Sequence, residues 1–283
     1  MKYIKYFIQF IIIIFLFILF KIIGLKISSF ISGTIFTLIG PFFRSNDLSH
    51  NNLNLAFPEM NKNEKNKILK KMWFNYGIMF VEYIFIKELK KAEKIIIENQ
   101  KILEDIKVNS EQVIFISGHF NNFELMAMHL EKSGINLAAI YRPLNNIFLN
   151  PIMEYIRKKH ICKIQIKKGI SGTKNILKKF NEGASIALMI DQRVSQGIKC
   201  DFFNKKAFTT TIPAQFVKKY GTKIVPIYIE RIQGSNFKLK INHPIKFDRE
   251  NSLESITLKL NQILESMIIK KPEQWIWTHN RWK

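Results

Sequence analysis

The longest apolar run of the chain lies at its amino terminus. Phe7 to Phe20 reads FIQFIIIIFLFILF without a charged residue, and after Lys21 the run continues as IIGL. A helix needs about 20 apolar residues to cross a bilayer, and lysines at its ends can extend to the headgroups. The pattern therefore predicts a membrane anchor over residues 1–26.

A second apolar stretch extends from Ile27 to Phe43 and contains two glycines and a proline. This pattern leaves three options open: a second span, an interfacial or re-entrant helix, or a buried helix of the body. A cleaved signal peptide is the main alternative for the anchor, because Lys2 and Lys5 precede the apolar run. The length of the run and the lack of a clear small-residue cleavage site favour an uncleaved anchor.

Basic residues flank the anchor on both sides. Lys21, Lys26 and Arg44 follow it and rival the two lysines before it, so the bias of positive charge toward the cytoplasm does not exclude a cytosolic body. The chain has only two cysteines, which excludes a disulfide framework and indicates a reducing compartment. We therefore expect the body on the cytosolic side of the membrane.

The remaining chain has the pattern of an α/β fold. Residues 61–91 have apolar positions at helical spacing and predict one or two helices. Further on, short apolar runs typical of buried strands alternate with helical stretches, which predicts a mixed central sheet flanked by helices in one domain over residues 27–283. The expected strands are 112–117, 137–140, 163–166, 185–190, 223–230 and 237–242, and the expected helices are 122–132, 147–159, 174–181, 214–220 and 253–269.

Two polar pairs come directly after apolar strands. Gly118-His119 follows the strand at 112–117, and Asp191-Gln192 follows the strand at 185–190. Ligands of such sheets bind beyond the carboxyl ends of the strands. These two strand ends therefore predict the position of a ligand site.

His119 and Glu124 are the most informative candidates for chemistry. They are five residues apart, about 500° around an ideal helix, so they cannot face the same way on one helix. They can meet if His119 lies in the loop and Glu124 in the first turns of the next helix. Glu124 would then accept from one imidazole nitrogen, leaving the other to act as a base. A structural histidine that caps the helix, with an incidental glutamate, fits the spacing as well.

The context of this pair resembles a known motif. Ser117 to Glu124 is similar to the His-x4-Glu/Asp motif of glycerolipid-type acyltransferases, and nearly the whole chain resembles the lipid A biosynthesis acyltransferase family. The segments that carry this resemblance are Tyr141 to Asn146, Asp191-Gln192 with the threonines at 209–211, and the terminal PEQWIWTHNRWK at 272–283. The family usually has two basic residues before the final aromatic, and here Asn280 replaces one of them.

The resemblance implies an acyltransferase of the bacterial inner membrane that needs no cofactor. It would move an acyl chain from an acyl carrier protein thioester to a hydroxyl of the Kdo-bearing lipid A precursor, without an acyl-enzyme. His119 would be the general base and Glu124 would orient it. Arg142 would stabilise the oxyanion or bind a phosphate or carboxylate. The substrate-binding candidates are Arg142, Asn145, Asp191 and Gln192.

The charge of the chain fits these partners. There are 44 Lys and Arg against 22 Asp and Glu, a formal net charge of +22, which draws a protein to acidic carriers, phosphorylated lipids and acidic membrane surfaces. The basic residues are scattered, so compositional bias explains the surplus equally well. We expect no nucleic-acid partner.

Three other functions stay open from the residues: a membrane-tethered protein that binds anions without chemistry, a lipid esterase with the same His–Glu pair, and a phospholipid or other glycolipid acyltransferase. A zinc site is not expected, because His119, Glu124 and His129 lack the His-Glu-x-x-His spacing. The chain has no Gly-x-Ser-x-Gly elbow of a serine hydrolase.

Overall fold

The computed structural model describes residues 1–43, 46–92 and 94–283. The apolar amino terminus forms two helices, α1 (Lys2–Ile23) and α2 (Leu25–Phe43), and both are long and apolar enough to cross a membrane. Gly24 joins them with a φ of 89°, which favours glycine at this turn. Arg44, one of the charges flanking the anchor, lies outside the described residues.

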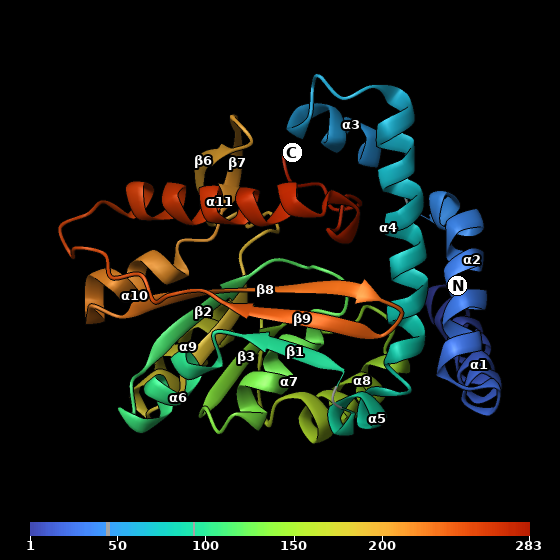
Figure 1. The fold of residues 1–283 in the computed structure, drawn as a ribbon, viewed down its shortest axis with the longest axis horizontal. Coiled ribbons are helices and arrows are strands. Elements are labelled where there is room, and N and C mark those ends of the chain that lie inside the picture. The colour runs from blue at the N-terminus through green and yellow to red at the C-terminus, as the bar shows by residue number, and fades with distance from the viewer. Residues whose placement is uncertain (44–45, 93) are drawn as a thin grey trace.

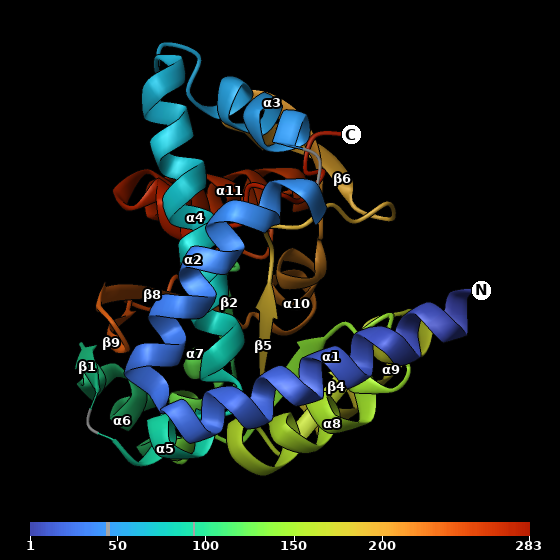
Figure 2. The same ribbon diagram turned by 90° about the vertical axis from the view of Figure 1, so that its right-hand side faces the viewer.

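The two apolar helices pack on the body to different extents. α2 packs along the long helix α4 (Lys62–Glu82), and the close approach of Gly77 to the backbone of Ser32 leaves no room for a side chain there (Figure 2). α1 is largely exposed, yet it touches the body near both ends. The side-chain amide of Asn146 donates to the carbonyl of Tyr6 at 2.9 Å, and Lys21 pairs with Glu88.

The body is built on a seven-stranded sheet in the order β1-β9-β8-β2-β5-β3-β4 (Figure 1). All neighbouring pairs are parallel except β8 with β9, so the sheet is mixed, as the pattern predicts. The strands are β1 (Ile95–Glu98), β2 (Val113–Ser117), β3 (Leu137–Tyr141), β4 (Ile164–Lys167), β5 (Ser185–Met189), β8 (Lys223–Gln233) and β9 (Asn236–Ile241). A separate hairpin is formed by β6 (Ile198–Phe202) and β7 (Lys205–Thr209).

Helices cover the sheet on both sides, with α11 on one side and α6 and α7 on the other (Figure 1). Their bounds are α3 (Asn46–Ala56), α5 (Ile86–Lys91), α6 (Gln100–Val108), α7 (Glu124–Lys132), α8 (Leu149–Ile156), α9 (Ile170–Asn181), α10 (Ile212–Tyr220) and α11 (Leu253–Lys270). A π-helical turn at Arg157–Ile161 extends α8, and a 3₁₀ turn at Pro272–Gln274 follows α11. The α/β fold is therefore confirmed.

Strand register brings the two predicted strand ends together. In the parallel pair of β2 and β5, Ser117 lies opposite Met189, so Gly118 and His119 leave the sheet beside Asp191. A Cβ on Gly118 would lie 2.9 Å from a methyl of Leu264 and 3.2 Å from Oδ2 of Asp191. The absence of a side chain at Gly118 allows this close approach.

A buried ion pair ties α4 to the sheet. Arg231 of β8 donates to both oxygens of Glu82 at 2.6 and 2.9 Å, and both side chains are almost fully buried. Ser235 and Asn122 donate to the same carboxylate at 2.9 and 3.1 Å. Because Asn122 belongs to the loop between β2 and α7, the end of α4 is connected directly to the loop that carries His119.

Candidate active site

His119 is held by a carboxylate from the neighbouring strand end. Its Nδ1 lies 2.7 Å from Oδ1 of Asp191, and its backbone N–H donates to Oδ2 of the same residue at 2.7 Å. The ring also packs edge-on against Phe123 at a centroid distance of 4.7 Å. These three contacts fix both the backbone and the plane of the imidazole.

The protonation of the pair follows from its surroundings. Burial favours the neutral acid of Asp191, but the nearby His119 and the hydrogen bonds from His119 and Trp275 outweigh it and lower the pKa of Asp191 to about 2. An ionised carboxylate can only accept, so Nδ1 of His119 carries a proton and donates it. The neutral ring then has its lone pair on Nε2, as a general base requires.

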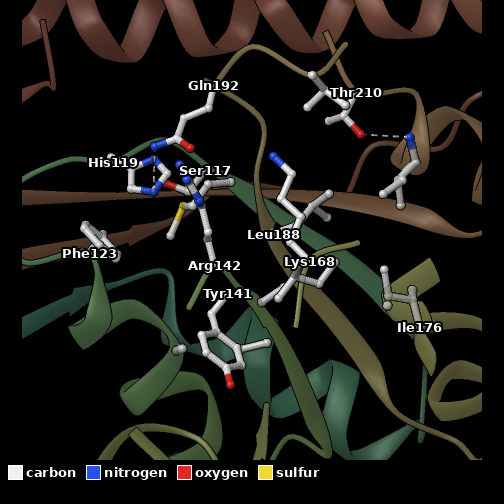
Figure 3. A pocket seen from close by; sticks show the side chains of 18 of the residues that line it. Ser117, His119, Phe123, Tyr141, Arg142, Lys168, Ile176, Leu188, Gln192 and Thr210 are labelled. Atoms are coloured by element: carbon white, nitrogen blue, oxygen red, sulfur yellow. Dashed lines mark hydrogen bonds between the residues drawn. The ribbon is translucent and has the colours of Figure 1, made fainter. Parts of the chain in front are cut away.

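His119 lines a cavity of about 710 Å³ beyond the strand ends. The walls are apolar on the sheet side, where Phe115, Ala139 and Leu188 contribute, and polar where His119 and Gln192 lie. Arg142 and Lys168 extend toward the same polar side (Figure 3). A cavity of this size with an apolar wall and a few converging polar groups has the features of a small-molecule or lipid site.

The partner expected for His119 is found elsewhere. Glu124, the first residue of α7, accepts from Nε and Nη2 of Arg157 at 2.8 and 2.6 Å and from the hydroxyl of Tyr83 at 3.0 Å. Asp191, and not Glu124, therefore occupies Nδ1 of His119, which corrects the expected contact. Glu124 and His119 still line the same cavity.

Arg157 and Tyr83 make Glu124 part of a buried cluster. Arg157 begins the π-helical turn after α8, a feature frequently found at functional sites. Burial and the neighbouring carboxylate of Glu124 raise the pKa of Tyr83 well above its usual value, so Tyr83 is a hydrogen-bond donor at neutral pH. Glu124 and Arg157 of this cluster line the cavity and balance each other's charge.

The substrate-binding candidates lie around the polar side of the cavity. Gln192 Nε2 is 3.5 Å from Nε2 of His119, and Arg142 is within 3.4 Å of the side-chain oxygen of Asn145. Arg142 and Gln192 line the cavity, whereas Asn145 and Asp191 do not. Asp191 contributes through its contact with His119. Burial and the charge of Arg142 lower the pKa of Lys168, which also lines the cavity.

Within the described residues, no group of three or more His, Cys, Asp or Glu side chains converges in a way that could hold a metal ion. The arrangement offers a positioned base, two nearby cations and an apolar wall. It can therefore deprotonate a hydroxyl beside an apolar substrate.

Comparison with known proteins identifies the family. The chain matches the family described as "Bacterial lipid A biosynthesis acyltransferase" over residues 1–283. The chain belongs to this family. It is thus an enzyme, an acyltransferase of lipid A biosynthesis.

Individual members of the lipid A acyltransferase family are distant relatives of this chain. It is 24% identical over 241 residues to the "Lipid A biosynthesis lauroyltransferase" of Escherichia coli strain K12, covering 83% of this chain and 78% of the relative. It is 26% identical over 247 residues to a "Lipid A biosynthesis acyltransferase" of Haemophilus influenzae, covering 83% and 76%. The "Lipid A biosynthesis myristoyltransferase" of Escherichia coli strain K12 is 21% identical over 234 residues, covering 80% and 71%.

The terminal segment that resembles this acyltransferase family packs directly on the site. Trp275 Nε1 donates to Oδ2 of Asp191 at 2.9 Å, the same oxygen that accepts from the backbone N–H of His119. Arg281 is buried and donates to the carbonyl of Phe208 and the hydroxyl of Thr209. Asn280, which departs from the usual basic residue, is exposed and lies outside the cavity lining.

Proposed function

We propose that this acyltransferase moves a fatty acyl chain from an acyl carrier protein thioester to a hydroxyl of the Kdo-bearing lipid A precursor, with His119 as the general base. The observation that carries the proposal is the Asp191-held imidazole of His119 in the wall of a 710 Å³ cavity. Because Nδ1 is occupied by Asp191, Nε2 is the ring nitrogen of His119 that is left to act on a substrate. Glu124 lines the same cavity, and its ion pair with Arg157 holds this part of the cavity wall in place.

The reaction needs few groups because the donor is already activated. Nε2 of His119 takes the proton of the acceptor hydroxyl while its oxygen attacks the thioester carbon. The tetrahedral intermediate then breaks its carbon–sulfur bond, and the imidazolium returns the proton to the departing thiolate. An ester and a free thiol result, and no covalent enzyme intermediate is required.

The charge distribution supports the proposed donor and acceptor. Acyl carrier proteins are acidic, and lipid A precursors bear phosphates and Kdo carboxylates, so a chain with a net charge of +22 attracts both. Arg142 and Lys168 would receive such an anion beside the base. Since the carrier protein is cytosolic, this function also requires the body on the cytosolic face of the inner membrane.

The deciding experiment is a transfer assay with membranes that contain the wild-type or the His119→Ala protein. Labelled acyl carrier protein thioester and Kdo-bearing lipid A precursor are supplied, and the label is followed into lipid. We expect a more highly acylated lipid A with the wild type and a loss of about 10³-fold or more with His119→Ala.

Other outcomes would reject parts of this function. Label released as free fatty acid without an acceptor indicates an esterase. Label transferred to phospholipid, or only from a coenzyme A thioester, indicates a different acceptor or donor. Equal activity of the two proteins removes His119 from the mechanism.

A further inference from the structure

His279 is a second histidine in the wall of the cavity. It belongs to the terminal segment after the turn at Pro272–Gln274, and its side chain lines the same cavity as His119. Its backbone carbonyl accepts from the amide of Asn52 at 2.8 Å, so α3 holds this segment in place. His119 and His279 therefore belong to the wall of the same cavity.

The hydrogen bonds of His279 determine which nitrogen carries its proton. Nε2 lies 3.1 Å from the backbone nitrogen of Arg193 and accepts its N–H. A backbone N–H can only donate, so Nε2 has no proton and the neutral ring must carry it on Nδ1. Burial lowers the pKa of His279 to about 4, which agrees with a neutral ring at physiological pH.

Nδ1–H of His279 is therefore a neutral donor in the active-site wall. Among the described residues, no acceptor for this N–H is found, although the opposite nitrogen is engaged. A free donor on a rigidly held ring in a cavity is suited to an oxygen atom of a ligand.

Three backbone N–H groups next to His119 are already engaged and cannot supply this donor. The N–H of His119 is bonded to Asp191, that of Phe120 to the carbonyl of Gly118, and that of Asn121 to the carbonyl of Gln274. These three N–H groups beside the base are all occupied. The side chains that line the cavity are therefore the next candidates to stabilise a negative charge on a substrate oxygen.

We propose that Nδ1–H of His279 donates to the carbonyl oxygen of the thioester and stabilises its negative charge in the tetrahedral intermediate. This inference rests on the proposed acyl transfer. The hydroxyl oxygen bonds to the thioester carbon, its proton passes to Nε2 of His119, and the carbonyl π electrons move to the oxygen that His279 contacts. When the carbon–sulfur bond breaks, the C=O bond is restored and the thiolate takes the proton from His119.

The neutrality of His279 separates its role from that of His119. Its proton stays on Nδ1, since Nε2 is engaged by Arg193, so it polarises the carbonyl without acting as a second base. Its removal lowers turnover more than donor binding, because the interaction strengthens only as the oxygen becomes charged.

Two isosteric substitutions test the proposal. His279→Asn puts an amide N–H near the position of Nδ1 but loses the acceptor for the N–H of Arg193. His279→Gln puts an amide near the position of Nε2, where its oxygen can accept from Arg193, but loses the Nδ1–H donor. We expect kcat to fall about 10²- to 10³-fold in His279→Gln with KM for the thioester within about threefold. His279→Asn should retain at least about tenfold more turnover.

The crossed design separates a chemical role from a structural one. If His279 only held the Arg193 loop, His279→Gln would keep most turnover and His279→Asn would lose it, which overturns the proposal, as does equal activity of both variants. His243→Leu, an exposed histidine outside the cavity, is the matched control and should match the wild type. An inactive wild type would reject the proposed substrates, while an active wild type with the reversed order of variants rejects only the role of His279.

Discussion

Asp191 holds His119 at two points, with one carboxylate oxygen on the ring nitrogen and the other on the backbone nitrogen, each at 2.7 Å. The same carboxylate accepts from Trp275 at 2.9 Å. With three hydrogen bonds and almost no exposure, Asp191 cannot change orientation without breaking one of them. The tautomer of His119 therefore depends on this residue.

The substitution Asp191→Asn tests this dependence. An asparagine can present its NH₂ group to Nδ1, which favours the wrong tautomer and moves the proton to Nε2. We expect kcat to fall about 10³- to 10⁴-fold, with protein levels in the membrane maintained. The measurement is the rate of acyl transfer at saturating donor. An increase in KM with kcat unchanged would mean that Asp191 binds substrate and does not orient His119.

Glu124 and Arg157 should behave as one unit. If Glu124 acts by holding Arg157 in the cavity wall, Glu124→Gln and Arg157→Met should each reduce kcat by a similar factor of roughly 100, because the wall is displaced. The double variant should be no worse than the single variants. Turnover measured for all three proteins decides this point.

A much larger loss for Glu124→Gln than for Arg157→Met would contradict that expectation. It would restore the direct pairing of Glu124 with His119 that the sequence spacing suggests. Tyr83→Phe serves as the control, since it removes one hydrogen bond to Glu124 and leaves the ion pair with Arg157 in place.

The strand ends and the sheet are the part of the site that the sequence predicts best. The strand 112–117 and the strand 185–190 both end in polar pairs, and their parallel pairing puts His119 beside Asp191. The spacing of His119 and Glu124 suggested a pair, but Glu124 begins α7 and meets Arg157, 33 residues away. A π-helical turn depends on an inserted residue and on tertiary packing, and no periodicity signals it.

Several elements were missed for physical reasons. α3 is rich in polar residues, and its buried Asn52 and Ser49 are polar, so it lacks an apolar stripe. β6 and β7 carry lysines at exposed positions and form a small hairpin against α11, so they lack a continuous apolar run. β1 has only four residues and lies at the edge of the sheet, so its pattern is short. His279 gave no separate signal, because its role follows from the backbone N–H of Arg193, which no sequence pattern reveals.

The ion pair of Glu82 and Arg231 should contribute strongly to stability only as a pair. Arg231→Met leaves the carboxylate of Glu82 buried with two remaining donors, so we expect the free energy of unfolding to fall by about 3–5 kcal/mol. The double variant Glu82→Leu with Arg231→Met should recover most of this loss. Denaturant titration of the detergent-solubilised protein measures both. Equal destabilisation by the single and double variants would contradict the expectation.

Stability should decrease as the pH falls through the mildly acidic range. Burial lowers the pKa of His129 and of His279 to about 4, below the value of about 6.5 in an unfolded chain. The unfolded state therefore binds protons first, and the stability present above pH 6.5 is lost between about pH 6.5 and 4. The melting temperature recorded across this range should decline, and His129→Leu should reduce the slope. A pH-independent melting temperature between these values would contradict this reading of the buried histidines.

The end of α4 has a consequence for how the enzyme meets its substrate. α4 packs along α2 on one side, and at its carboxyl end Glu82 and Tyr83 bind Asn122 and Glu124, on either side of Phe123, which touches the ring of His119. α4 therefore connects the apolar helix α2 to the loop that carries His119, the proposed base. Under the proposed function, with α2 at the membrane, this rigid connection would fix the distance between His119 and the bilayer, and the acceptor hydroxyl would have to reach that distance.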